Sequence, residues 1–97
     1  MTSQFPKDEL YALTNQMRRA SISVTSNIAE GAARRTPKEF VRFLYISSGS
    51  LSELETQILI SVDLGYKKEA EIKDLLKIIV SLRGQIHSTI RSLQQRI

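Results

Sequence analysis

Apolar residues recur every three or four positions along almost the whole of this 97-residue chain, in three successive stripes. The stripes run from Leu10 to Ile28, from Phe40 to Val62 and from Ile72 to Ile97. Spacing by three and four places side chains on one face of an α-helix, whereas a half-buried strand needs strict alternation. The sequence therefore predicts an all-α fold.

The segments between the stripes are short, which makes consecutive helices antiparallel neighbours. We expect helices over about 7–30, 37–64 and 68–96, within a single domain that covers residues 1–97. The predicted architecture is an up-and-down antiparallel helical bundle. The third stripe contains one four-residue step too many for a strict heptad, so a long coiled coil is not predicted.

Local signals set the predicted helix ends. Pro6 suits the first turn of the first helix. We expect Gly31 and Gly65 to adopt the left-handed conformation that ends helices. Thr36 and Glu39 form the pattern of a capping box at the start of the second helix, in which the Glu39 carboxylate accepts from the Thr36 amide.

Small residues are frequent in the middle of the first two helices. Two interpretations are open. The first, which we favour, is close helix packing with the hydroxyls bonded to backbone carbonyls. The second is a close-approach surface for a ligand or subunit. The residues are Ser21, Ser23, Ser26, Asn27, Ser47, Ser48, Gly49, Ser50 and Ser52.

The composition argues against several function classes. The chain has no cysteine, so it has neither a disulfide framework nor a thiolate site. Residues Met1–Asp8 lack the apolar core of a signal peptide, and no stretch approaches the roughly 20 apolar residues of a membrane span. We therefore expect a cytoplasmic protein without a membrane partner.

Catalytic and metal-binding patterns are also missing from the sequence. Glu30, Glu53 and Glu55 could belong to a carboxylate metal site, but such centres in helical bundles need two Glu-x-x-His motifs, and His87 is the single histidine. No serine has a histidine and an acid in a plausible order. We expect no enzyme activity, no metal, no cofactor and no small-molecule substrate.

Basic residues cluster in one quarter of the chain. Between Arg18 and Arg42 there are six basic residues and two acids, while the whole chain has a net charge of +4. Four basic side chains at the start of the second helix, together with its free amides, are suited to binding a phosphate. The competing interpretation is a solvated face that keeps the protein soluble. The candidate residues are Arg34, Arg35, Lys38 and Arg42, with Arg18 and Arg19 as less central members.

Arg18 and Arg19 are adjacent and point about 100° apart on a helix, so at most one can join the other four. Either could instead pair with Glu30 or Glu55 inside the assembly. Few aromatic rings are free for base stacking, so contacts to phosphates should dominate and binding should weaken with salt. The leading hypothesis is a non-enzymatic oligomer that binds RNA or DNA; the alternative is a protein–protein interaction or structural module.

Four segments and a turn resemble a known family. The chain is similar to the four-helix-bundle proteins encoded in intervening sequences of bacterial 23S ribosomal RNA genes, from about Phe5 to Leu93. The resemblance is carried by Leu13–Ala20, Ser23–Gly31, Phe40–Leu44, Gly49–Gln57 and the Asp-Leu-Gly-Tyr turn at Asp63–Tyr66.

The resemblance implies a left-handed helical bundle that assembles into a ring, reported as pentameric, with a suspected nucleic-acid role and no catalytic residue. Such proteins have an additional first helix before the Phe-Pro that is Phe5-Pro6 here. This sequence does not contain that helix, so either its start is downstream of the true one or another chain covers the exposed stripe. We expect the chain not to be monomeric.

Overall fold

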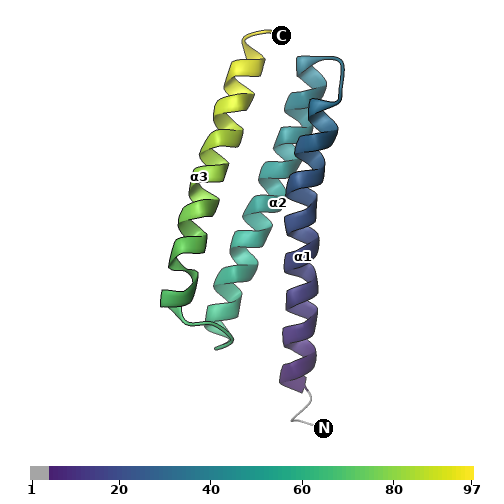
Figure 1. The fold of residues 1–97 in the computed structure, drawn as a ribbon. Coiled ribbons are helices and arrows are strands. Elements are labelled where there is room, and N and C mark those ends of the chain that lie inside the picture. The colour runs from purple at the N-terminus through teal and green to yellow at the C-terminus, as the bar shows by residue number, and fades with distance from the viewer. Residues whose placement is uncertain (1–4) are drawn as a thin grey trace.

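Three α-helices of nearly equal length make up the protein in a computed structural model, which describes residues 5–97 (Figure 1). They are α1 (Phe5–Ala32), α2 (Pro37–Asp63) and α3 (Glu69–Gln94). Each lies within two residues of its predicted bounds. The prediction of an all-α up-and-down bundle is confirmed, while part of the segment searched for a signal peptide, residues 1–4, lies outside the described residues.

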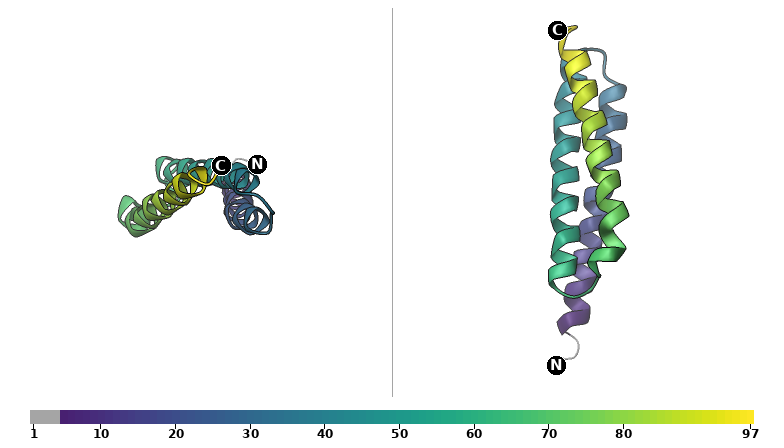
Figure 2. Two further views of the ribbon diagram at one scale, coloured as in Figure 1. Left: turned by 90° about the horizontal axis from the view of Figure 1, so that it is seen from above. Right: turned by 90° about the vertical axis from the view of Figure 1, so that its left-hand side faces the viewer.

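The central helix is α2, and α1 and α3 each pack against it. Within residues 5–97, no Cα atom of α1 comes within 8 Å of one of α3. Seen along the helices, α1 and α3 extend from α2 like the arms of a V (Figure 2). The bundle is therefore open on one side, and its core lies along α2.

The core consists of the stripe residues that the spacing placed on one face. Leu51 and Ile58 of α2 and Ile90 of α3 are almost completely buried. Val24 of α1 joins the same cluster, while Met17 is half-buried beside it. Burial of this apolar face, at about 25 cal/mol per Å², is the main stabilising contribution.

The predicted start of α2 is correct, although its capping differs in one detail. The Thr36 hydroxyl oxygen accepts from the Glu39 amide at 3.2 Å, as expected for an N-cap. The Glu39 carboxylate accepts from the Thr36 hydroxyl at 3.2 Å, and not from the Thr36 amide as predicted. At the other end of α2, Gly65 has a φ of 81°, which confirms the predicted left-handed turn.

The prediction for Gly31 is wrong. Gly31 is helical, does not have a positive φ, and lies inside α1, which ends at Ala32. A Cβ atom at this position would lie 2.8 Å from Phe40 Cδ1 and 2.8 Å from Phe43 Cβ. Glycine is needed here because α1 approaches the start of α2 closely, which is a tertiary reason and not a local one.

Three of the small residues, Ser23, Ser47 and Ser50, serve packing between α1 and α2. The Ser47 hydroxyl is fully buried and donates to the Val24 carbonyl of α1 at 2.7 Å. The hydroxyls of Ser23 and Ser50 lie 2.7 Å apart across the same contact. Gly49, in contrast, is exposed, and a methyl group added there would meet no atom within 4 Å, so Gly49 is not part of this contact.

Candidate nucleic-acid interface

The up-down-up topology brings the end of α1, the start of α2 and the end of α3 to the same end of the bundle (Figure 1). Six basic side chains lie on these three segments, against two acidic ones, Glu30 and Glu39. The excess of four equals the formal net charge of the whole chain, +4. We call these six residues the basic end: Arg34, Arg35, Lys38, Arg42, Arg91 and Arg96.

Arg91 and Arg96 were missed in the sequence. Arg91 is 49 and Arg96 is 54 positions after Arg42, and only the antiparallel return of α3 places them at the same end. Both are exposed, and Arg91 lies in the last turn of α3, where a cation also interacts favourably with the helix dipole. The predicted up-down-up order of the helices was the one signal in the sequence that could have placed Arg91 and Arg96 beside the start of the second helix.

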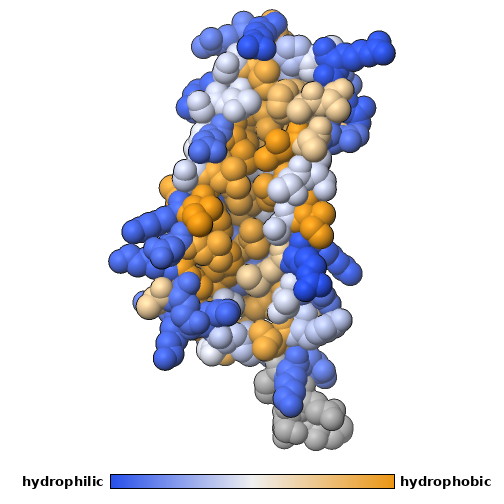
Figure 3. Space-filling view, viewed as in Figure 1, coloured by the Kyte–Doolittle hydropathy of each residue, from blue (hydrophilic) through white to orange (hydrophobic). Residues whose placement is uncertain are grey.

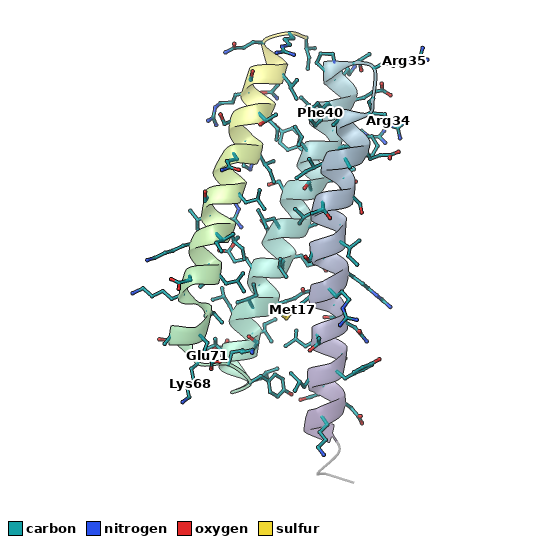
Figure 4. The ribbon with its side chains drawn as sticks, viewed as in Figure 1. Met17, Arg34, Arg35, Phe40, Lys68 and Glu71 are labelled. Carbon is teal, nitrogen blue, oxygen red and sulfur yellow. The ribbon has the colours of Figure 1, made fainter. Side chains whose placement is uncertain are left out.

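The aromatic ring of Phe43 organises two of the arginines. The guanidinium carbons of Arg34 and Arg42 lie 4.9 Å and 5.1 Å from the centre of this ring, within range of cation–π attraction. Arg34 also donates to Glu30 at 2.7 Å in an exposed pair. Arg34 is therefore partly neutralised, while Figure 4 shows Arg35 pointing away from the bundle into solvent.

A surface hollow of about 440 Å³ adjoins this cluster and is lined by Lys38, Glu39, Val41, Arg42 and Tyr45, so two cations face one acid there. The Tyr45 ring is half exposed, and its hydroxyl accepts from the Gln94 side-chain amide at 3.4 Å. The Tyr45 and His87 rings form a T-shaped pair, with centroids 6.5 Å apart and an angle of 69° between the ring planes. Tyr45 thus connects α2 to the end of α3.

Arg91 lies on the same side of α3 as these Tyr45 contacts. It is three residues before Gln94 and four after His87, and residues at these separations are neighbours on a helix surface. The arrangement presents a partly exposed aromatic ring between cations from two helices. Such a surface can bind a phosphate and place a ring against a base.

The backbone at the start of α2 contributes less than predicted. Pro37 has no N–H, the Glu39 amide donates to the Thr36 hydroxyl, and the Phe40 amide donates to the Thr36 carbonyl at 3.2 Å. Fewer amides than expected are therefore free at this helix start, because the cap takes that of Glu39 and the first helical hydrogen bond takes that of Phe40. An anion here would be held mainly by side chains.

Arg18 and Arg19 are not part of the basic end. They are exposed on α1, and Arg19 is thirteen residues before the end of the helix, or about 20 Å at 1.5 Å per residue. Within one chain neither residue pairs with Glu30 or Glu55, because other partners occupy both acids, and their pairing inside an assembly stays a prediction. Glu30 pairs with Arg34, and Glu55 accepts from Arg83 at 2.6 Å between α2 and α3.

The acids and the histidine do not form a reactive cluster in residues 5–97. No group of three or more His, Cys, Asp or Glu side chains that could hold a metal is found there. His87 is half-buried, and its Nε2 lies 3.1 Å from the Ser48 hydroxyl. No carboxylate in this part of the chain hydrogen-bonds to His87, so the pair lacks the third member of a catalytic triad.

The chain matches a known protein family. The family described as 23S rRNA-intervening sequence protein matches residues 1–88. The chain belongs to this family. The range matched to the 23S rRNA-intervening sequence proteins contains Arg34, Arg35, Lys38 and Arg42 of the basic end, whereas Arg91 and Arg96 lie beyond it.

Two further findings concern this family member. A comparison with curated proteins found no match. None of the helices in the described residues has the length and apolar content needed to cross a membrane.

Proposed function

We propose that this protein is a non-enzymatic member of the family that binds RNA or DNA through contacts between the basic end and phosphates. The observation that carries the proposal is the location of charge. The basic end holds an excess equal to the whole net charge, and the opposite end has nearly balanced charges. A concentrated positive field attracts a polyanion and orients it on the surface.

Contacts would be made by exposed cations on three segments. Arg35 and Lys38 are exposed, and neither makes an ion pair with a described acid. Arg42 and Tyr45 border the same hollow, which provides a guanidinium for a phosphate and a ring for a base. Contacts to phosphates carry no sequence information directly, so binding should depend little on sequence.

The test is fluorescence anisotropy of a labelled ribosomal RNA fragment, and of DNA of the same sequence, titrated with the protein at several salt concentrations. Neutralisation of about four phosphates predicts a slope of about −2.8 for a single strand to −3.6 for a duplex in log K against log salt, or about 50- to 150-fold weaker binding from 50 to 200 mM salt. Comparison of the two probes determines the preference for RNA or DNA.

A charge-matched pair of variants separates a local site from a general effect of net charge. Arg35→Glu with Lys38→Glu reverses two exposed cations beside the start of α2. Lys67→Glu with Lys68→Glu makes the same change in net charge beside the start of α3, at the opposite end. In both variants the new acids lie near a helix N-terminus, where a negative charge is tolerated.

We expect the first double variant to lose binding at moderate salt and the second to retain most of it. Equal loss in both would mean that net charge alone governs binding and that the basic end is not a site. No binding by the natural protein at low salt would refute the proposal and leave a protein-interaction module as the working function.

A further inference from the structure

The Tyr45 side chain is an aromatic ring fixed at the border of the basic end. Tyr45 is half exposed, and its contacts with Gln94 and His87 both come from α3. His87 is in turn held from α2, because its Nε2 lies 3.1 Å from the Ser48 hydroxyl. The ring is therefore positioned before a ligand arrives, so little side-chain freedom is lost when it makes a contact.

Cations lie on both sides of this ring. Lys38 is seven residues before Tyr45, so the two side chains lie about 20° apart around α2 and about 10 Å apart along it. Arg42 lies between them and lines the same hollow. On the far side of the ring, Arg91 lies on the side of α3 that carries Gln94. A strand that crosses the ring would therefore meet cations for its phosphates before and after it.

The ring and these cations lie away from the open side of the V. Figure 3 shows mainly apolar residues along that side, with hydrophilic residues at its margins, so phosphates have few partners there. Phe40 and Leu44 line a hollow between α1 and α3, and Tyr45 points about 140° and 100° away from them around α2. A bound strand would therefore follow the outer surface of α2 and α3.

We infer that the basic end selects single-stranded nucleic acid over a duplex, because Tyr45 stacks on an unpaired base while the cations around it bind the flanking phosphates. This selection rests on the proposed function, phosphate binding at the basic end. Inside a duplex both faces of a base are covered by its neighbours, so an aromatic side chain needs an unpaired base or has to force one out of the stack. Every base has a π-face, so this contact tolerates any sequence.

The test compares a short labelled DNA strand that cannot pair with itself and the same strand in a duplex, by fluorescence anisotropy at one moderate salt concentration. We expect the natural protein to bind the single strand more tightly. Tyr45→Leu keeps an apolar side chain without a ring, and should weaken single-strand binding about 5- to 30-fold. This is the lower part of the range for base stacking, because half of the ring is covered. Duplex binding should stay nearly unchanged.

Two controls separate stacking from the other roles of this side chain. Tyr45→Phe keeps the ring and loses the Gln94 contact, so it should keep the preference for a single strand. An abasic strand of the same length has the same phosphates and no bases, so the natural protein and Tyr45→Leu should bind it equally well. If Tyr45 only held α2 and α3 together, Tyr45→Leu would weaken binding of all three probes alike.

A tryptophan in place of this tyrosine detects the contact directly and remains usable if Tyr45→Leu unfolds. The natural chain has no tryptophan, so Tyr45→Trp introduces a single indole ring that can also stack. The single strand should quench its emission, and the duplex should quench it much less. The matched control is Tyr11→Trp, at an exposed position near the start of α1 and thus at the opposite end of the bundle. Neither probe should change its emission.

The possible results distinguish this selection from the proposed function. No binding of any probe at low salt refutes the proposed function and the selection with it. Equal affinity for strand and duplex, or an affinity ratio that Tyr45→Leu leaves unchanged, overturns the selection and leaves phosphate binding in place. Emission of Tyr45→Trp that does not respond to a bound single strand overturns it in the same way.

Discussion

Replacing Gly31 or Gly49 with alanine makes the same chemical change at two helical positions, and we expect opposite effects on stability. In each case alanine gains up to about 1 kcal/mol because glycine loses more backbone entropy in a helix. At Gly49 nothing lies within 4 Å of the added methyl group, so that gain should be realised. At Gly31 the methyl group would meet two phenylalanines.

The cost at Gly31 follows from which atoms must move. The Phe40 ring carbon, at 2.8 Å, can tilt away, but Phe43 Cβ, also at 2.8 Å, is attached to the α2 backbone and moves only if the helices separate. Overpacking of this kind costs about 1–3 kcal/mol, and we take the upper part of that range. Gly31→Ala should therefore be about 1–2 kcal/mol less stable than the natural protein.

The assay is thermal and urea unfolding followed by circular dichroism at one fixed chain concentration, because self-association would link stability to concentration. A difference of about 2–3 kcal/mol between the two variants corresponds to melting temperatures about 10–20 °C apart. If Gly31→Ala were as stable as the natural protein, close approach of α1 and α2 would not be the reason for glycine at this position.

Three other changes test separate contacts. Glu55→Ala removes the ion-pair partner of Arg83. Because both side chains are over a quarter exposed, we expect the free energy of unfolding to fall by about 1 kcal/mol, which is less than for a fully buried pair. An unchanged urea midpoint would refute a stabilising role. Ser47→Ala removes a buried hydrogen bond between α1 and α2 and should cost about 1 kcal/mol by the same measurement. Burial, the charge of Glu9 and a hydrogen bond to Glu9 raise the pKa of Tyr66 above its ordinary value of 10.0. This effect stabilises the fold below the ordinary pKa and disappears as pH rises through the raised one; Glu9→Gln should lower the pKa in a spectrophotometric titration, and an unmoved titration curve would contradict the contact.

Local sequence signals were sufficient for the helices themselves. The stripe spacing, the Thr36 cap and the left-handed Gly65 depend on interactions within a few residues, and each was predicted correctly. The fold class follows from these signals and from the short connections, because short connections leave consecutive helices no arrangement other than antiparallel neighbours.

Features that depend on distant residues were not accessible in this way. The local sequence around Gly31 predicts the end of a helix. Only the short distance from an added Cβ atom to Phe43 shows that glycine is needed there for close helix packing. Arg91 enters the candidate interface because α3 returns to the end where α2 begins. Periodicity identified the apolar stripes but not the angle between α1 and α3, which decides how much of each stripe remains open.

The position of α2 between two helices whose Cα atoms stay more than 8 Å apart has a consequence for folding. All pairs of helices in residues 5–97 whose Cα atoms come within 8 Å are neighbours in the chain, so contact order is low and folding should be fast. The α1–α2 and α2–α3 hairpins are joined mainly through α2, and beyond it by side-chain contacts such as the Tyr66–Glu9 hydrogen bond, so we expect that α3 can open while the α1–α2 hairpin stays closed, and the reverse. Native-state hydrogen exchange should then resolve two cooperative units with different opening free energies, with the amides of α2 protected in both.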